Sequence, residues 1–207
     1  KQKVFFLPDA IYQVKDFINK KKYPLQSSIL DNKRIILGIG RLTRQKNFSF
    51  LINEFSIFLK KNKDFRLLIL GDGEEKSKLQ NIIKALKLEN DVFLVGRVDN
   101  IFNYLRRSEI FILSSLWEDP GFVLVEAGLG NTFVISSDCP NGPKEILDYG
   151  KNGLLYKSNL KYEIANTLND YLLLNNKQKF VMKKNLKKYI SKYSIFRHFH
   201  SFEKIFK

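Results

Sequence analysis

Short continuous apolar runs alternate along this chain with stretches whose apolar residues recur every three or four positions. The runs are of the kind buried on both faces of a parallel sheet. They predict strands at 34–40, 65–70, 91–96, 109–116, 132–137 and 153–156. The helical spacing predicts helices at 48–59, 74–88, 101–107, 122–129, 160–174 and 177–193, with a terminal helix from about residue 195. This alternation predicts an α/β fold, a doubly wound, Rossmann-like parallel sheet of about six strands with helices on both faces.

The same pattern divides the chain into three predicted parts. Residues 1–30 are a lead-in, in which the apolar run 4–7 is stopped by Pro8. Residues 31–175 carry the strand and helix alternation, and residues 176–207 are C-terminal helices. The chain starts at Lys1, and we expect it to be a fragment of a longer protein. No apolar run has the length that a membrane-spanning helix needs.

Composition excludes several classes of protein. Of the 207 residues, 44% are hydrophobic and 14% aromatic, which excludes a mainly disordered chain. The single cysteine, Cys139, excludes an internal disulfide framework and a cysteine-based zinc finger, and it fits a cytoplasmic location. The two histidines, His198 and His200, lie near the C-terminus, so a histidine-centred triad or metal site would have to use them.

The net charge of +15 is compatible with nucleic acid, an anionic membrane or an acidic substrate, and equally with the lysine bias of an AT-rich coding sequence. Seven lysines crowd residues 177–192. We interpret them as a solvated helix face. The alternative is peripheral contact with the inner face of the plasma membrane, where each basic residue contributes about 1 kcal/mol. The aromatic residues follow helical spacing rather than forming a stacking platform, so no nucleic-acid partner is expected.

Ligands of doubly wound sheets bind at the carboxyl ends of the strands, so the loops after the predicted strands should carry the chemistry. Gly38-x-Gly40 and Gly71-x-Gly73 both follow strands, but neither completes the G-x-G-x-x-G fingerprint of a dinucleotide site. We interpret these glycines as permitting close turns between strand and helix.

The loop 40–47 carries Arg41, Arg44 and Lys46 between a strand end and a helix N-terminus. Free N–H groups, a positive helix dipole and an arginine fork together suit a diphosphate. From these residues alone, a solvated basic loop explains the sequence equally well.

The segment 114–127 holds two acids eight residues apart, Glu118 in a loop and Glu126 in the following helix, with Gly121 at the helix start. Carboxylates accept paired hydrogen bonds from vicinal hydroxyls, as on ribose or a sugar ring. A surface acid pair is the alternative. Glu126 stands in an otherwise apolar helix, however, and a buried acid needs a compensating partner.

Glu118 and Glu126 form E-x7-E within W-E-x-x-G-F-x-L-x-E-A. Together with G-R-L…K-N at 40–47, L-G-D-G at 70–73 and G-P-K-E-I at 142–146, this pattern resembles the C-terminal half of family 4 glycosyltransferases over about residues 34–173. The resemblance implies the donor-binding half of a retaining, metal-independent enzyme of the GT-B fold, with no cofactor other than its nucleotide-sugar substrate.

The resemblance also implies roles for the charged residues. Arg41 and Lys46 match the basic pair that holds the donor diphosphate. Glu126 matches the acid that binds the ribose, and Glu118 matches the acid at the donor-sugar hydroxyls and the reaction centre, the catalytic position.

Further positions match segments that contact the donor through the backbone. Gly121, Phe122 and Val123 match the stretch whose N–H groups meet the donor sugar and phosphate. Arg97 and Val98 match the strand-end segment that flanks the base. No metal ligand is implied. Asp119-Pro120 departs from the small or aromatic residues that commonly follow the first glutamate.

The function implied is transfer of a sugar, with retention, from a nucleotide-sugar to a growing glycan in bacterial surface polysaccharide or glycan biosynthesis. A UDP-sugar is the expected donor. A glycan or lipid-linked acceptor would bind an absent N-terminal domain, toward which the helix 196–206 would cross back. Two alternatives stay open: a sugar-nucleotide epimerase and a non-catalytic nucleotide-binding module. The E-x7-E spacing favours the transferase.

Overall fold

The computed structural model describes residues 7, 9–10, 12 and 33–205. They form one six-stranded sheet in the order β3-β2-β1-β4-β5-β6, with every neighbouring pair parallel. The strands are β1 (Arg34–Ile39), β2 (Phe65–Leu70), β3 (Val92–Gly96), β4 (Ile110–Leu113), β5 (Phe133–Ser137) and β6 (Leu154–Tyr156). The predicted doubly wound, Rossmann-like sheet is confirmed.

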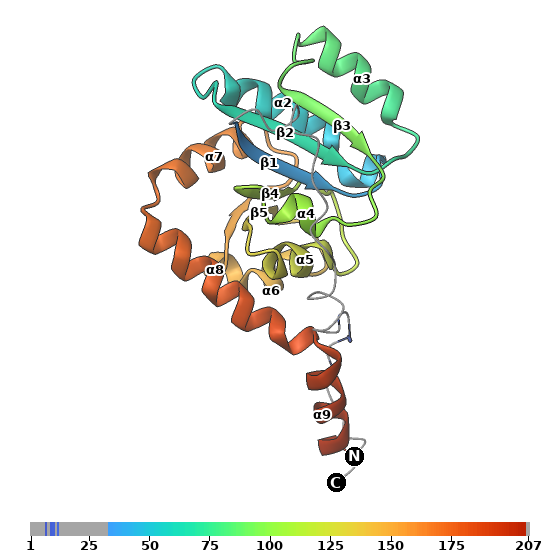
Figure 1. The fold of residues 1–207 in the computed structure, drawn as a ribbon, viewed down its shortest axis with the longest axis vertical. Helices are drawn as coiled ribbons and strands as arrows, with labels where there is room; N and C mark the ends of the chain where they lie inside the picture. The colour runs from blue at the N-terminus through green and yellow to red at the C-terminus, as the bar shows by residue number, and fades with distance from the viewer. Residues whose placement is uncertain (1–6, 8, 11, 13–32, 206–207) are drawn as a thin grey trace.

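Helices cover both faces of this sheet, because alternate strand residues point to opposite sides. Ile36 packs with α2 (Phe48–Leu59), α3 (Lys76–Ala85) and α7 (Glu163–Leu173) in one buried cluster. Its neighbours Ile35 and Leu37 belong to the other cluster. That second layer contains α4 (Phe102–Leu105), α5 (Val123–Leu129), α6 (Pro143–Ile146) and α8 (Asn176–Ile190). The two layers lie above and below the sheet in Figure 1.

Helix α8 packs tightly on α5. It begins with a capping box between Asn175 and Gln178, and its inner side buries Leu186 and Ile190. A Cβ atom on Gly128 of α5 would lie 2.7 Å from Ile190 Cδ1 and 3.0 Å from Leu186 Cγ. The contact therefore requires glycine on α5, and α8 is an integral part of the second layer.

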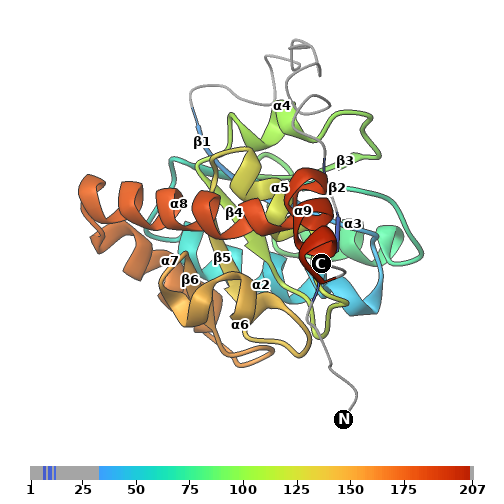
Figure 2. The same cartoon turned by 90° about the horizontal axis from the view of Figure 1, so that it is seen from below.

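Helix α9 (Ile195–Ile205) extends away from the body of the molecule (Figure 1) and is seen nearly end-on in Figure 2. None of its residues 195–205 is buried. Phe196 is 80% exposed and Phe199 is 61% exposed. These phenylalanines form an apolar face that the described residues leave uncovered.

Several helices and strands begin or end at other residues than predicted. The strand expected over 109–116 ends at Leu113, because the chain then turns into a hydrogen-bonded loop. The helix expected from residue 74 begins at Lys76, since the N–H of Glu75 bonds to the carbonyl of Leu42. The helix expected from 160 begins at Glu163, directly after Tyr162, whose φ is +70°.

Helix α6 and a short 3₁₀ turn at Asp148–Gly150 were not predicted. A four-residue helix is too short to display a helical period, so its sequence carries little signal. The lead-in expected over residues 1–30 lies almost wholly outside the described residues, as do the last two residues of the chain.

Candidate functional site

The strand order reverses between β1 and β4, so the loops after these two strands lie side by side at the carboxyl edge of the sheet. Hydrogen bonds join the two loops. Ser114 Oγ donates to the carbonyl of Lys46 at 2.7 Å, and the N–H of Leu116 donates to the carbonyl of Gln45 at 2.8 Å. Gln45 Nε2 donates to the carbonyl of Trp117 at 2.9 Å. The sheet thus fixes loop 40–47 against loop 114–122.

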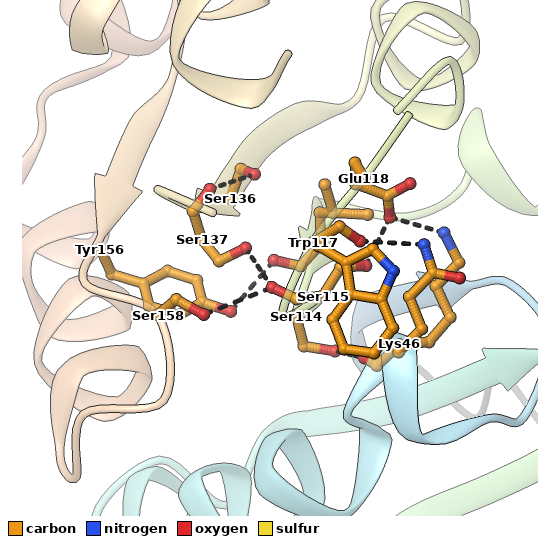
Figure 3. Close-up of polar contacts among 11 residues, drawn as sticks. Lys46, Ser114, Ser115, Trp117, Glu118, Ser136, Ser137, Tyr156 and Ser158 are labelled. Carbon is orange, nitrogen blue, oxygen red and sulfur yellow. Dashed lines mark hydrogen bonds and ion pairs between the residues drawn. The ribbon is translucent and has the colours of Figure 1, made fainter. Parts of the chain in front are cut away.

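Lys46 and Glu118 meet at this junction (Figure 3). Glu118 Oε1 accepts from Lys46 Nζ at 2.5 Å and from Ser115 Oγ at 2.5 Å. The side chains of Lys46 and Glu118 are 15% and 5% exposed. A buried carboxylate requires a counter-charge and hydrogen bonds, and Glu118 has both.

Polar side chains on β5 and β6 hydrogen-bond to the chain just before Glu118, as Figure 3 shows. Ser137 Oγ donates to the carbonyl of Ser115 at 2.7 Å. Tyr156 Oη donates to the carbonyl of Leu113 at 3.0 Å. Burial raises the pKa of Tyr156 well above its ordinary value, so the phenol stays a neutral donor. These supporting residues were not predicted from the sequence. The serine pairs at two strand ends, Ser114-Ser115 and Ser136-Ser137, are the pattern that could have indicated them.

The loop before α6 holds Glu118 from another side. The N–H of Glu118 donates to the carbonyl of Pro140 at 3.2 Å. Gly142 has φ +117°, and a Cβ atom there would lie 2.0 Å from the carbonyl oxygen of Pro120. This close approach explains why a glycine stands in the G-P-K-E-I segment.

A pocket of about 410 Å³ adjoins the junction at the carboxyl ends of β1, β2 and β3. Its described lining includes the exposed side chains of Arg41 and Arg97, with Val98, Asp72 and Gly71. Gly71 allows the β1 and β2 loops to touch, because a Cβ atom there would lie 1.9 Å from the carbonyl oxygen of Gly40. Arg41, predicted for the diphosphate, and Arg97 and Val98, predicted to flank the base, therefore share one pocket.

Gly40 connects this pocket to the charged pair. It lines the pocket, and a Cβ atom on it would lie 3.1 Å from the Cγ, Cδ and Cε atoms of Lys46. The aliphatic part of the Lys46 side chain therefore packs against Gly40, and its ammonium group bonds to Glu118. The pocket and the pair are contiguous.

Gly121 and Phe122 lead into α5, and Val123 is its first residue. The N–H of Leu124 is the first to bond back within this turn, to the carbonyl of Gly121, so the N–H groups of 121–123 precede the helical ladder. Gly121 has φ +84°, and a Cβ atom there would lie 3.4 Å from Glu118 Cγ. The segment therefore lies next to Glu118.

Glu126 occupies the first turn of α5 and is half-buried, whereas its apolar helix suggested a fully buried acid. The structure places it one helical turn beyond Phe122, whose carbonyl accepts its N–H at 3.1 Å. The role of Glu126 in binding ribose stays a prediction.

Residues 19–193 match the family model of the glycosyl transferases group 1. The chain belongs to this family.

Two relatives illustrate the range of the glycosyl transferases group 1. An uncharacterized glycosyltransferase of Methanocaldococcus jannaschii is 37% identical over 190 residues, 84% of this chain and 47% of that protein. A Campylobacter jejuni protein, N-acetylgalactosamine-N,N'-diacetylbacillosaminyl-diphospho-undecaprenol 4-alpha-N-acetylgalactosaminyltransferase, is 32% identical over 147 residues, 71% of this chain and 39% of that protein. The chain thus spans less than half the length of these relatives.

A solved structure confirms the fold assignment. Alr3699/HepE of Anabaena, crystallised in complex with UDP, superposes with a TM-score of 0.76 at 21% identity, covering 88% of this chain and 53% of that one. At this identity the likeness concerns the fold, which is the Rossmann-like half of a GT-B glycosyltransferase.

The described residues of this group 1 domain contain neither a metal-binding cluster nor a membrane-spanning helix. Among residues 33–205 and the few described before them, no three His, Cys, Asp or Glu side chains gather where they could hold a metal ion. His198 and His200 lie on α9, outside the site. None of the described helices is long and apolar enough to cross a membrane.

Proposed function

We propose that this chain is the donor-binding domain of a glycosyltransferase that moves a sugar, with retention, from a nucleotide-sugar to a growing glycan. One observation carries the proposal. The Lys46–Glu118 pair stands at the topological switch point, contiguous with a pocket that presents Arg41 and Arg97. Doubly wound sheets bind their ligands at this crevice.

Arg41 and Lys46 bind the donor diphosphate in this proposal. Charge develops on the leaving diphosphate as the glycosidic bond breaks, and fixed cations stabilise it most where water is excluded. Lys46 is mostly buried, so its charge acts at low dielectric. Glu118 accepts hydrogen bonds from the sugar hydroxyls and lies at the reaction centre.

The remaining predicted contacts surround this centre. Backbone N–H groups of Gly121, Phe122 and Val123 bind the sugar and phosphate, as unbonded N–H groups at a helix start bind anions. Glu126 binds the ribose hydroxyls, and the segment of Arg97 and Val98 flanks the base.

A UDP-sugar is the proposed donor, and no metal is needed because Arg41 and Lys46 neutralise the diphosphate. UDP is the nucleotide named with the Anabaena structure. The Campylobacter relative is named for a diphospho-undecaprenol acceptor. We therefore propose a glycan acceptor on a lipid, bound by a partner domain that covers the exposed phenylalanines of α9, and peripheral contact with an anionic membrane.

Calorimetry with UDP in excess EDTA tests the proposal. Parent protein should bind, and Arg41→Gln should weaken binding about tenfold, because it removes a charge-assisted bond worth about 1.5 kcal/mol. Arg44→Gln is the matched control: Arg44 lies in the same loop and is exposed, but the pocket lining does not include it. Equal losses in the two variants would contradict the assignment of Arg41, and binding abolished by EDTA would contradict metal independence.

An assay of sugar transfer and sugar interconversion separates this proposal from an epimerase. The chain alone should bind UDP-sugar yet transfer no sugar, because retaining transfer needs an acceptor positioned against the anomeric carbon. Interconversion of two UDP-sugars by the chain would favour an epimerase. Efficient glycan formation by these residues alone would contradict the two-domain proposal.

A further inference from the structure

A second and larger pocket, of about 610 Å³, lies at the opposite end of the sheet from the donor loops. It lies where β4 and β5 begin, between the C-terminal end of α5 and helix α8. Four basic side chains line it: Arg106, Lys179, Lys183 and Lys187. Nothing in the proposed donor chemistry uses them.

The charge of this pocket is strongly positive. Glu109 is the one carboxylate among the described residues that line it. Its two oxygens accept from Arg34 at 2.7 and 2.5 Å, and Tyr171 Oη donates to it at 2.8 Å. Because Arg34 already neutralises Glu109, the three lysines of the lining, Lys179, Lys183 and Lys187, give the pocket an excess of positive charge.

Lys179 is a partly buried cation of this pocket. Its Nζ lies 4.0 Å from the centre of the Tyr171 ring. Burial lowers the pKa of Lys179, although the charge of Glu109 acts in the opposite direction. An anion entering the pocket would meet an ammonium group that is already partly desolvated.

Large apolar side chains are exposed beside these cations. Phe180, which lines the pocket, is 63% exposed, and Leu173, two residues after the lining residue Tyr171 at the end of α7, is 83% exposed. Phe180, Lys183 and Lys187 lie three and four residues apart, so one flank of α8 presents an aromatic ring and two lysines together. Figure 1 shows α8 running along the outside of the molecule.

We propose that this pocket binds the phosphate of an anionic phospholipid headgroup, with Phe180 and Leu173 entering the bilayer interface beside it. The lysines complement the phosphate charge. The exposed apolar side chains favour a bilayer over a free anion, because dissolved phosphate offers nothing to cover them. The inference deepens the peripheral membrane contact proposed above. It leaves the donor loops, at the other end of the strands, open to solvent.

Vesicle co-sedimentation of this chain tests the inference, with phosphatidylcholine vesicles that contain or lack phosphatidylglycerol. The pocket variant is Lys183→Gln/Lys187→Gln. The matched control is Lys184→Gln/Lys188→Gln, which has the same spacing and charge change on the same helix but lies outside the pocket lining. We expect about a thirtyfold loss of partitioning for the pocket pair and at most about threefold for the control pair.

The results of these experiments either support the lipid-binding pocket or overturn it. Equal losses in the two pairs would show diffuse attraction and overturn the pocket, as would equal binding to both kinds of vesicle. Phe180→Ser should weaken vesicle binding in high salt, and an unchanged affinity would overturn the apolar contact. Inorganic phosphate bound in solution without any vesicle binding would overturn the lipid as its source. UDP affinity should be unchanged in the pocket variant, which verifies its fold and keeps this test separate from that of the donor site.

Discussion

Lys46 Nζ lies 2.5 Å from Glu118 Oε1, although 72 positions separate the two residues in the chain. The cation proposed for the diphosphate is therefore already paired with the acid proposed for the sugar. This pairing stabilises a buried carboxylate before any ligand arrives. An incoming diphosphate must share Lys46 with Glu118, which keeps the ammonium group oriented at the donor site.

The pair should contribute measurably to stability. Lys46→Met leaves the Glu118 carboxylate buried with the Ser115 hydroxyl as its remaining side-chain partner, and we expect a loss of about 2 to 3 kcal/mol in the free energy of unfolding. Urea denaturation measures this loss. Adding Glu118→Gln in the same chain should recover part of it, because the unpaired charge is then gone.

Lys144→Met is the control for this prediction. Lys144 Nζ lies 3.5 Å from Asp138 Oδ2, and the two side chains are 51% and 29% exposed. Loss of so solvated a pair should cost at most about 0.5 kcal/mol. Equal costs for the two lysine variants would mean that Lys46 and Glu118 form no more than a surface contact.

Glu126→Gln should weaken UDP binding more than it changes stability. A carboxylate that accepts two ribose hydroxyl bonds contributes about 2 to 3 kcal/mol, so calorimetry should show a fall in affinity of about thirtyfold or more. Glu89→Gln, in the exposed turn before β3, should bind UDP as the parent does. If Glu126→Gln also bound UDP at parental affinity, the ribose assignment would be wrong.

Gly142→Ala should destabilise the protein more than Gly150→Ala. Both glycines have positive φ, +117° and +98°, so both substitutions carry backbone strain of about 1 kcal/mol. At Gly142 the new methyl group also meets the Pro120 carbonyl oxygen at 2.0 Å, whereas at Gly150 nothing lies within 4 Å.

We expect about 3 kcal/mol for Gly142→Ala in thermal or urea denaturation, because the loop that carries Glu118 must shift. UDP affinity should fall in this variant alone. Equal destabilisation of the two variants would show that the loops around Pro120 and Gly142 separate at little cost.

Stability should depend on pH through Glu109. Burial raises the pKa of this carboxyl group. Hydrogen bonds from Arg34 and Tyr171 and the nearby positive charges together lower it by more, so its pKa lies below the ordinary value of 4.5. A lowered pKa in the folded state stabilises the protein above the unfolded-state pKa, and this stabilisation is lost as the pH falls through the folded value.

Glu109→Gln should therefore be less stable than the parent at neutral pH, by about 1 to 2 kcal/mol. The difference should shrink as the pH falls from about 4.5, where Glu109 of the unfolded chain takes up a proton, through the lower pKa of the folded protein. Urea denaturation from about pH 3 to about pH 7 measures this difference. Parallel stability curves for parent and variant would contradict the role of the Arg34 pair.

The order of strands and helices could be predicted from the sequence because its determinants are local. The runs that became β1 and β2 are apolar at consecutive positions since both of their faces are covered. The period of α2 follows from the one side that it buries. The exact ends of the helices and strands could be predicted less well. Glu75 and Ser114 leave their predicted elements because each bonds to loop 40–47, a partner that the local sequence does not identify.

Part of the candidate site could likewise be predicted from local sequence, and part depended on the fold. Arg41, Lys46 and Glu118 could be named from their loops and from the family pattern, and E-x7-E is a local spacing. The pairing of Lys46 with Glu118, the support from Ser137 and the second pocket were decided by tertiary structure alone. The physical reason is that β1 and β4 become neighbours through burial of both sheet faces. That burial is a property of the whole chain, and it places side chains together that no local pattern relates.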